Sequence, residues 1–456
     1  MKTIFITAFH PFISKNILNT DVFKLLKARN DLKIILLVPE SKSDFFKDNY
    51  GSDKVVVESI VEIPFLNSRL NNFFSKAALF FIYSHWTRRK RRDYLNANRS
   101  FYNLIKFHLF MVLTRILSGH KTINRIIRYF DWHYSPSNFF DKQFEAHKPD
   151  LVFSADVYND FDQALIKEAK MRKIIVIGMI RSWDNNVSKG LMRFMPDKLI
   201  VNNEVIKKEA IQLHNYPEKN LIVAGLPQFD DYLKTPFHNR ENFFGFLGGD
   251  PAKKTILFAP GSPENTDEAK LTVCRVLKEA KEKNILPANV QFLVSKHPQY
   301  PNDFQKLIGD KNFMIMTIGT RIKNVRKYTE ISPEDSIQLA DMLYYSDVLI
   351  WMASSICLDA LVFDKPEIVV NFDGFENKPY WSSVRRFHDE DHMRSFLKTG
   401  GISIAKKPAD IISFVKSYLE NPKLNAEGRE KARVEQLWRV DGKSGERIAN
   451  FILSFV

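Results

Sequence analysis

Residues 151–180 read LVFSADVYNDFDQALIKEAKMRKIIVIGMI, and this stretch decides the fold class. Two short apolar runs, 151–157 and 174–180, flank a segment with helical periodicity. Continuous apolar runs between helices predict parallel strands that are buried on both faces of a sheet. The same alternation extends back to Thr3 and begins again at Thr255. We therefore predict an α/β protein with two Rossmann-like domains.

The domain boundary is predicted from the Pro-, Gly- and polar-rich stretch 235–251, TPFHNRENFFGFLGGDP. We place an N-terminal domain at 1–240, with a basic helical insertion at 66–135, and a C-terminal domain at 241–430. The last helical segment, 431–456, is expected to pack back across the junction. Open parallel sheets bind ligands outside the carboxyl ends of their strands, so two facing sheets predict a central cleft for the ligand.

The composition is that of a globular protein, with 45% hydrophobic and 26% charged residues. The only cysteines, Cys274 and Cys357, are far apart and each lies in an apolar helical segment. This pattern excludes a disulfide framework and a thiolate metal site, and it favours a cytoplasmic protein. The N-terminus lacks the long apolar region of a signal peptide. Charged residues interrupt the most apolar stretch, 101–117, so no membrane span is expected.

Most of the net charge of +14 lies in one segment, since Lys76–Arg128 contains twelve Lys or Arg residues and one acid, Asp93. Apolar runs beside cations are typical of proteins that contact an anionic bilayer. Two interpretations stay open: core-packed helices with a solvated basic loop, and peripheral contact with the inner face of the plasma membrane. The segment has no nucleic-acid recognition motif, so no nucleic acid is expected. The membrane residues we predict form one basic block: Arg88, Arg89, Lys90, Arg91 and Arg92.

In the second domain, three predicted strand ends carry residues suited to a nucleotide diphosphate. A glycine allows close approach of the backbone to a phosphate, and helix N-termini, hydroxyls and a cation add hydrogen bonds and charge. A carboxylate one helical turn later can reach a ribose hydroxyl. Each feature alone is also typical of an ordinary turn or helix cap. The candidates for binding the donor are Gly261, Ser262, Lys296, His297, Ser354, Ser355 and Asp359.

In the first domain, Arg181, Trp183 and Asn185 follow the apolar run 174–180 and form the predicted acceptor side. Trp183 can stack on a sugar face, and the polar side chains can bond hydroxyl groups. The candidates for the general base are Asp184 and His10, which follows the first apolar run. The alternatives are an Asx-type turn with Trp183 in the core, and a structural role for His10.

Several motifs of the chain are shared with a known group of enzymes: His297-Pro298, Ser346-Asp347, Ser354-Ser355, Asp359, Lys365-Pro366, Arg181–Asn185, Ser188–Gly190 and Gly225–Asp230. On these motifs the chain resembles the GT-B group that includes surface-polysaccharide glycosyltransferases and CDP-glycerol glycerophosphotransferases. The resemblance covers about 150–375 and is weak in the first 150 residues. It implies that Ser354, Ser355 and Asp359 bind the nucleotide. The glycerophosphotransferases usually have Asp-Tyr before the serine pair, whereas this chain has Met352-Ala353, which favours sugar transfer.

We therefore predict a glycosyltransferase that moves a sugar from a nucleotide-sugar donor to a surface-polysaccharide or lipid-linked glycan acceptor. The alternatives are a CDP-glycerol-type polyol-phosphate transferase, a UDP-sugar 2-epimerase and a binding protein without catalytic activity. No cofactor and no metal are expected, because helix N-termini and cations can stabilise a leaving diphosphate. Asp160-Phe161-Asp162 resembles a metal-binding Asp-x-Asp pattern, but acids are also favoured where a helix begins.

Overall fold

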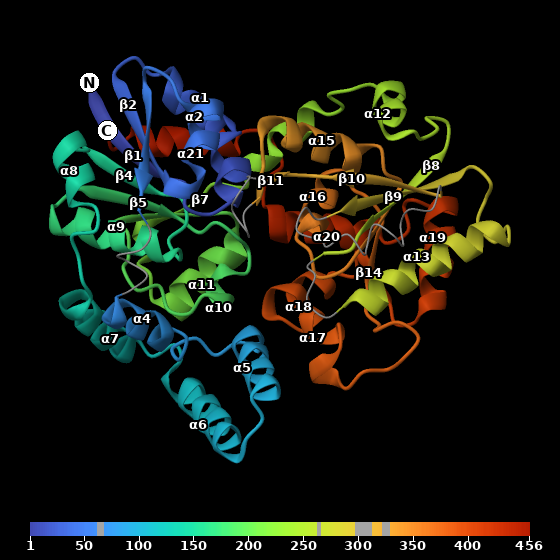
Figure 1. Ribbon diagram of the computed structural model, residues 1–456, viewed down its shortest axis with the longest axis horizontal. Coiled ribbons are helices and arrows are strands. Elements are labelled where there is room, and N and C mark those ends of the chain that lie inside the picture. The colour runs from blue at the N-terminus through green and yellow to red at the C-terminus, as the bar shows by residue number, and fades with distance from the viewer. Residues whose placement is uncertain (62–67, 262–265, 297–311, 322–328) are drawn as a thin grey trace. The chain divides into compact units, whose positions relative to one another are not determined.

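A computed structural model describes residues 1–61, 68–261, 266–296, 312–321 and 329–456. The chain divides into two units that each have their own sheet and core (Figure 1). Of the described residues, unit 1 contains Met1–Asp230 and Trp438–Val456. Unit 2 contains Asp231–Arg321 and Thr329–Leu437. This confirms the prediction of two domains of the Rossmann type.

Unit 1 is built on a seven-stranded parallel sheet in the order β3-β2-β1-β4-β5-β6-β7. The central strands are buried on both faces, which explains their continuous apolar sequences. The strands are β1 (Lys2–Thr7), β2 (Leu32–Pro39), β3 (Val55–Ile60), β4 (Leu151–Ser154), β5 (Ile175–Met179), β6 (Lys198–Val201) and β7 (Leu221–Val223).

Helices cover the sheet of unit 1 and begin at polar capping residues such as Thr20, Asn159 and Asn203. They are α1 (Asp21–Ala28), α2 (Ser43–Tyr50), α8 (Asp141–His147), α9 (Asp160–Met171), α10 (Asn185–Ser188), α11 (Glu204–His214) and α21 (Ser444–Leu453), with the short π-helix η1 (Ser14–Leu18) and the 3-10 helices η2 (Glu40–Lys42), η3 (Glu218–Asn220) and η4 (Pro227–Phe229).

The predicted basic insertion is helical and projects from unit 1, with α6 farthest from the sheet (Figure 1). It contains α4 (Arg69–Ala78), α5 (His85–Ala97), α6 (Phe101–Leu117) and α7 (Lys121–Tyr134). The basic block lies in α5 and not in a loop.

Unit 2 has a six-stranded parallel sheet in the order β10-β9-β8-β13-β14-β15. Its strands are β8 (Lys254–Ala259), β9 (Val290–Lys296), β10 (Phe313–Thr317), β13 (Val348–Trp351), β14 (Glu367–Val370) and β15 (Ile402–Ala405), and β11 (Thr320–Arg321) pairs antiparallel with β12 (Thr329–Glu330).

The helices of unit 2 include α13 and α16, whose cysteines, Cys274 and Cys357, are both free and buried. The helices are α12 (Arg240–Leu247), α13 (Asp267–Glu282), α15 (Pro333–Tyr344), α16 (Ile356–Val362), α17 (Arg385–His388), α18 (Asp391–Leu397), α19 (Pro408–Glu420) and α20 (Ala426–Leu437), with the turns η5 (Asp231–Lys234) and η6 (Tyr380–Ser382).

The division between the units falls after Asp230, earlier than the predicted boundary near residue 240. The reason is that the segment after Asp230 is held by side chains of unit 2. Tyr232 donates a hydrogen bond to Asp359, and the backbone N–H of Phe237 donates one to Asp341. The segment 235–251 is therefore part of unit 2 and not a free linker.

The C-terminal segment belongs to unit 1. Ile448 and Ile452 of α21 are fully buried in the core formed by β1, β2 and β4. The N–H of Gly445 donates to Asp230, and a side chain at Gly445 would press on Asp21 of α1. The end of the chain thus completes the core of the unit in which the chain begins.

The pH dependence of unfolding can be predicted at His388, which is buried beside Trp351 and bonded through Nδ1 to Asn371. Burial lowers the pKa of His388 to about 4 from an ordinary 6.5. The folded protein therefore excludes a proton that the unfolded chain binds below pH 6.5, so stability is lost as pH falls from 6.5 toward 4. At pH 5 the loss from this one group is about 2 kcal/mol.

His388→Asn removes this penalty. Chemical denaturation should show that the advantage of the wild type over the variant shrinks by about 2 kcal/mol between pH 7.5 and pH 5. An advantage that stays constant with pH would show that the ring is not held neutral.

Candidate functional site

Three neighbouring strands of unit 2 end at the same edge of its sheet. Strand β8 lies between β9 and β13 and pairs in parallel with both. Lys296 is the last residue of β9, Gly261 follows β8, and Ser354 and Ser355 follow β13. The structure therefore brings these predicted donor-binding residues to the carboxyl edge, where open parallel sheets bind their ligands.

The turns after β8 and β13 pack against each other through their backbones. Gly261 has φ +68°, and a Cβ atom there would lie 1.8 Å from the carbonyl oxygen of Met352. Ala353 also has positive φ, +43°, which is uncommon for a residue with a side chain and is typical of functional turns. Ser354 is partly exposed and Ser355 is exposed where α16 begins. Hydroxyl and N–H groups are thus available to phosphate oxygens at this turn.

Asp359 lies inside unit 2 and not at the surface where Ser355 lies. Its side chain is buried, and the hydroxyl of Tyr232 donates a 2.6 Å hydrogen bond to its Oδ1. The ribose contact of Asp359 stays a prediction, with Tyr232 as a competing partner. Ser262 and His297, the other predicted donor-binding residues, lie outside the described residues.

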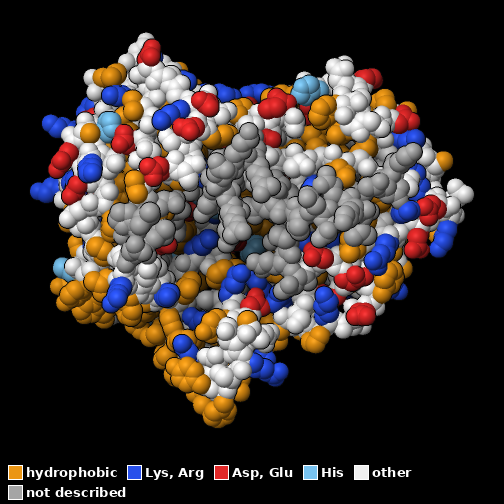
Figure 2. All heavy atoms as spheres, viewed as in Figure 1, with side chains coloured by type: hydrophobic (Ala, Val, Ile, Leu, Met, Phe, Trp, Pro, Cys, Tyr) orange, Lys and Arg blue, Asp and Glu red, His pale blue; other side chains and the backbone are white. Residues whose placement is uncertain are grey.

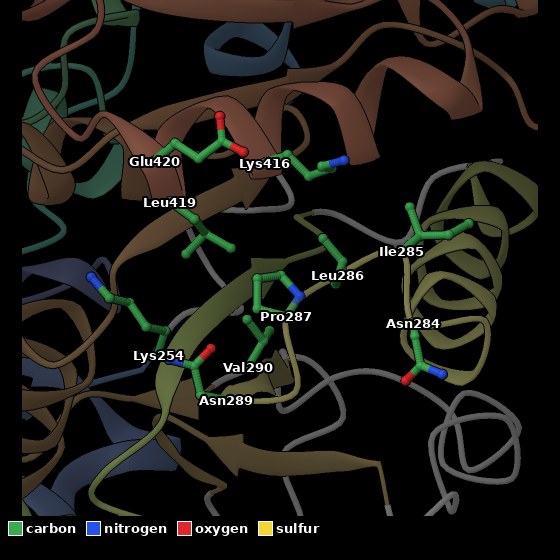
Figure 3. Close-up of a pocket in the computed structure, with 10 residues that line it drawn as sticks. All are labelled: Lys254, Asn284, Ile285, Leu286, Pro287, Asn289, Val290, Lys416, Leu419 and Glu420. Carbon is green, nitrogen blue, oxygen red and sulfur yellow. The ribbon is translucent and has the colours of Figure 1, made fainter.

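A cavity of about 400 Å³ lies at the opposite end of the same sheet, where β8 and β9 begin (Figure 3). Lys254 and Val290 contribute from the strands, and Lys416 and Glu420 contribute from α19. Because it adjoins the amino ends of parallel strands, this cavity is not where such a sheet binds a nucleotide.

In unit 1 the predicted acceptor side is organised around Asp156, which follows β4. Arg181 Nε donates to Asp156 Oδ2 at 2.8 Å, and Asn185 Nδ2 lies 3.5 Å from Asp156 Oδ1. Arg181, Asn185 and Trp183 are all buried. Arg181 and Asn185 thus converge on Asp156 and hold the loop after β5 in place, and Trp183 is buried in the same loop.

Asp184 is the partly exposed carboxylate of this loop. Its Oδ1 accepts a 2.6 Å hydrogen bond from the hydroxyl of Ser182, and its Oδ2 accepts a 3.0 Å bond from the hydroxyl of Ser188. The two serines fix the orientation of the carboxylate, which can accept a proton from a hydroxyl group placed beside it.

His10, after β1, lies among cations. Burial, and to a smaller extent the charges of Arg181, Lys189 and Lys42, lower its pKa to about 2, while the charge of Asp184 acts in the opposite direction. The imidazole is therefore neutral at physiological pH. Arg181 is paired with Asp156, so the three cations and the two acids, Asp156 and Asp184, leave this edge of unit 1 with a net positive charge that can attract an anionic group.

The hydrogen bond at Nδ1 determines which ring nitrogen of neutral His10 carries the proton. The backbone N–H of Phe12 donates to His10 Nδ1 at 3.2 Å. The proton of the neutral ring is then on Nε2, because Nδ1 is an acceptor. In this tautomer His10 Nε2 donates a hydrogen bond, which suits an anionic oxygen better than it suits proton abstraction.

Sequence reasoning did not single out Asp156, Lys42 or Lys189 as site residues. Asp156 and Lys42 each lie two or three residues after a strand, so their position at a carboxyl edge was a usable signal. Lys189 belongs to the Ser188–Gly190 motif but was not assigned a role. The buried contacts of Asp156 depend on the β5 loop and could not be inferred from its own segment.

Residues 183–454, more than half of the chain, match the model of the family described as CDP-glycerol:poly(glycerophosphate) glycerophosphotransferase. The match begins at Trp183, one residue before Asp184. No curated protein is significantly similar in sequence.

Solved structures share the fold over the full chain. A UDP-GlcNAc 2-epimerase from Neisseria meningitidis bound to UDP-GlcNAc has a TM-score of 0.56 at 14% identity, and the match covers 100% of both chains. A variant of the wall teichoic acid polymerase TagF soaked with CDPG has a TM-score of 0.52 at 14% identity, covering 99% of this chain and 88% of that one. A glycosyltransferase from Rickettsia africae has a TM-score of 0.50 at 10% identity, covering 100% and 98%. Together they show that the fold is GT-B, with two Rossmann-like domains.

Gly261→Ala should weaken nucleotide binding, because the new Cβ would collide with the Met352 carbonyl and push the turn before α16 out of place. Gly248→Ala is a matched control, since Gly248 has φ +69° but a Cβ atom there would have no other atom within 4 Å. In both variants the left-handed backbone costs about 1–2 kcal/mol. Only Gly261→Ala should weaken binding of CMP or UDP, by about tenfold or more, in titration calorimetry. Equal affinities in the two variants would remove this turn from the nucleotide site.

Proposed function

The chain belongs to the CDP-glycerol:poly(glycerophosphate) glycerophosphotransferase family, and on that premise we propose that it transfers a polyol phosphate from a CDP-activated donor to a hydroxyl group of a cell-envelope polymer. It is a transferase of the GT-B type. Unit 2 is proposed to bind the nucleotide, and unit 1 to hold the acceptor and the reacting phosphate.

The observation that carries this proposal is the group of cations around His10. A sugar hydroxyl needs no positive charge, whereas a phosphoryl group under attack and a phosphate-bearing polymer both carry negative charge. Lys42 and Arg181 are buried, so their charges act through little water, and Lys189 is exposed at the same edge. With Nε2 of His10 as a donor, these groups can stabilise charge on phosphate oxygens.

The proposed base is Asp184. The acceptor oxygen attacks the phosphorus of the polyol phosphate, its proton passes to Asp184, and the bond from that phosphorus to the oxygen of CMP breaks. One P–O bond forms as another breaks, and CMP leaves with the electron pair. The serines that bond Asp184 hold the carboxylate for this transfer.

Sugar transfer from a nucleotide sugar to a surface polysaccharide or lipid-linked glycan is the second candidate. It is favoured by Met352-Ala353, which stands where glycerophosphotransferases usually have Asp-Tyr. In that reaction the acceptor oxygen attacks the anomeric carbon, and a nucleoside diphosphate leaves. The likeness to 2-epimerases is one of fold alone, at 14% identity.

The leaving nucleotide separates the two candidates. The protein should be incubated with CDP-glycerol, CDP-ribitol and a panel of nucleotide sugars, together with a glycerophosphate oligomer, and the products separated by ion-exchange chromatography. We expect CMP, formed only when acceptor is present, and we expect EDTA to leave the rate unchanged because protein cations serve in place of a metal. Release of a nucleoside diphosphate from a nucleotide sugar would establish sugar transfer instead. A rate abolished by EDTA and restored by Mn²⁺ would contradict metal independence.

Asp184→Asn should lower kcat by about 10²–10⁴ with little change in the KM for the donor, because the amide keeps the shape of the carboxylate but cannot take the proton. Asp48→Asn is the control, since Asp48 is an exposed acid on α2 of the same unit. Steady-state kinetics of both variants measure the effect. An Asp184→Asn variant that changes KM alone would make Asp184 a binding residue, and the base would lie elsewhere.

A further inference from the structure

Exposed apolar side chains concentrate on α6 and α7 of the insertion. Twelve large apolar residues of these two helices are 36–78% exposed. Figure 2 shows hydrophobic side chains gathered over the lower left of the view, where Figure 1 places α6 and α7. Contiguous exposed apolar surface of this kind marks an interaction site. The residues are Phe101, Tyr102, Leu104, Ile105, Leu109, Val112, Leu113, Ile116, Ile126, Tyr129, Phe130 and Tyr134.

The orientation of α6 is fixed from its other face. Thr114 is fully buried and accepts a hydrogen bond from Arg91, whose guanidinium also lies over the ring of Phe110. Arg92 lies over the ring of Phe107, which is buried. The face of α6 that carries Phe107, Phe110 and Thr114 is therefore turned inward, and the aliphatic face with Leu109, Val112 and Ile116 is held outward.

The same contacts show that most of the predicted basic block does not form the exposed cationic surface that we expected from the sequence. Arg89 is buried and pairs with Asp93, and Arg91 and Arg92 hold α6. Within the block only Arg88 and Lys90 are exposed. Most of the block therefore supports the insertion, and the apolar surface lies beyond it.

The charges of α6 and α7 suit an anionic surface. Asp131 is the only acid in either helix, and it is buried in an ion pair with Arg193. Lys121 and Arg125 are exposed and line a cavity of about 530 Å³, together with Arg128, whose guanidinium bonds backbone carbonyls. Cations thus border the apolar surface, with no exposed acid on the two helices.

We propose that α6 and α7 lie in the surface of an anionic phospholipid bilayer, with the aliphatic face of α6 among the acyl chains and Lys121 and Arg125 at the phosphate headgroups. Among the described helices, none is long and apolar enough to cross a membrane, so the mode is interfacial. A second copy of the chain fits the surface less well, because a symmetric pair would bring two strongly cationic insertions together. The proposal is independent of which group the enzyme transfers.

Vesicle sedimentation of the full chain tests the proposal. The wild type should bind vesicles of phosphatidylcholine with phosphatidylglycerol, and less so at high salt, since screening weakens the cationic contribution. The variant Leu109→Gln, Val112→Gln, Ile116→Gln should bind about tenfold or more weakly at every salt concentration, because insertion of three apolar side chains is lost. These residues are exposed, so the fold should tolerate the change.

A matched control replaces Leu233, Phe246 and Val434 of unit 2, which are similarly or more exposed, by Gln and should bind vesicles like the wild type. Lys121→Gln with Arg125→Gln should weaken binding at low salt and leave the high-salt binding unchanged. Arg88→Gln with Lys90→Gln should have the smaller effect of the two charge variants. The proposal would be overturned if the wild type did not bind vesicles. It would also be overturned if ultracentrifugation showed that the wild type forms dimers and that the α6 variant does not.

Discussion

The ion pair between Arg181 and Asp156 ties the ends of β5 and β4 together, and the candidate site of unit 1 depends on it. Both side chains are buried, and breaking such a pair by removing one partner costs about 3–5 kcal/mol. The pair holds the loop on which Asp184 lies. It also keeps the charge of Arg181 close to His10, where that charge helps to keep the imidazole neutral.

The two sheets could be predicted from sequence because a parallel strand is buried on both faces and must be apolar throughout. Strand ends also follow from the same pattern, which is why Gly261, Lys296 and the serine pair could be placed at the carboxyl edge of the sheet. Contacts between distant segments could not be predicted. Tyr232 and Asp359 are far apart in sequence, yet their hydrogen bond assigns the segment after Asp230 to unit 2.

In the basic segment, too, the contacts between side chains of different helices could not be predicted from the sequence. Charge counting predicts a cationic surface, but it does not separate the arginines that face solvent from those that face a neighbouring helix. Arg91 is held by the Thr114 hydroxyl and the Phe110 ring, both on α6, and by the Phe80 ring in the segment between α4 and α5. The composition of α6 alone, with few charges and many aliphatic residues, could equally indicate a core helix.

The return of the chain to unit 1 at Trp438 has a consequence for synthesis on the ribosome. Ile448 and Ile452 fill the core beside β1, so this core stays incomplete while all of unit 2 is being made. In unit 2 the strands follow one another in sequence from β8 onward, so fewer residues are translated between its first strand and its last helix than in unit 1. The unit that is translated first is thus the one whose folding finishes last, and it is the one that chaperones would need to protect.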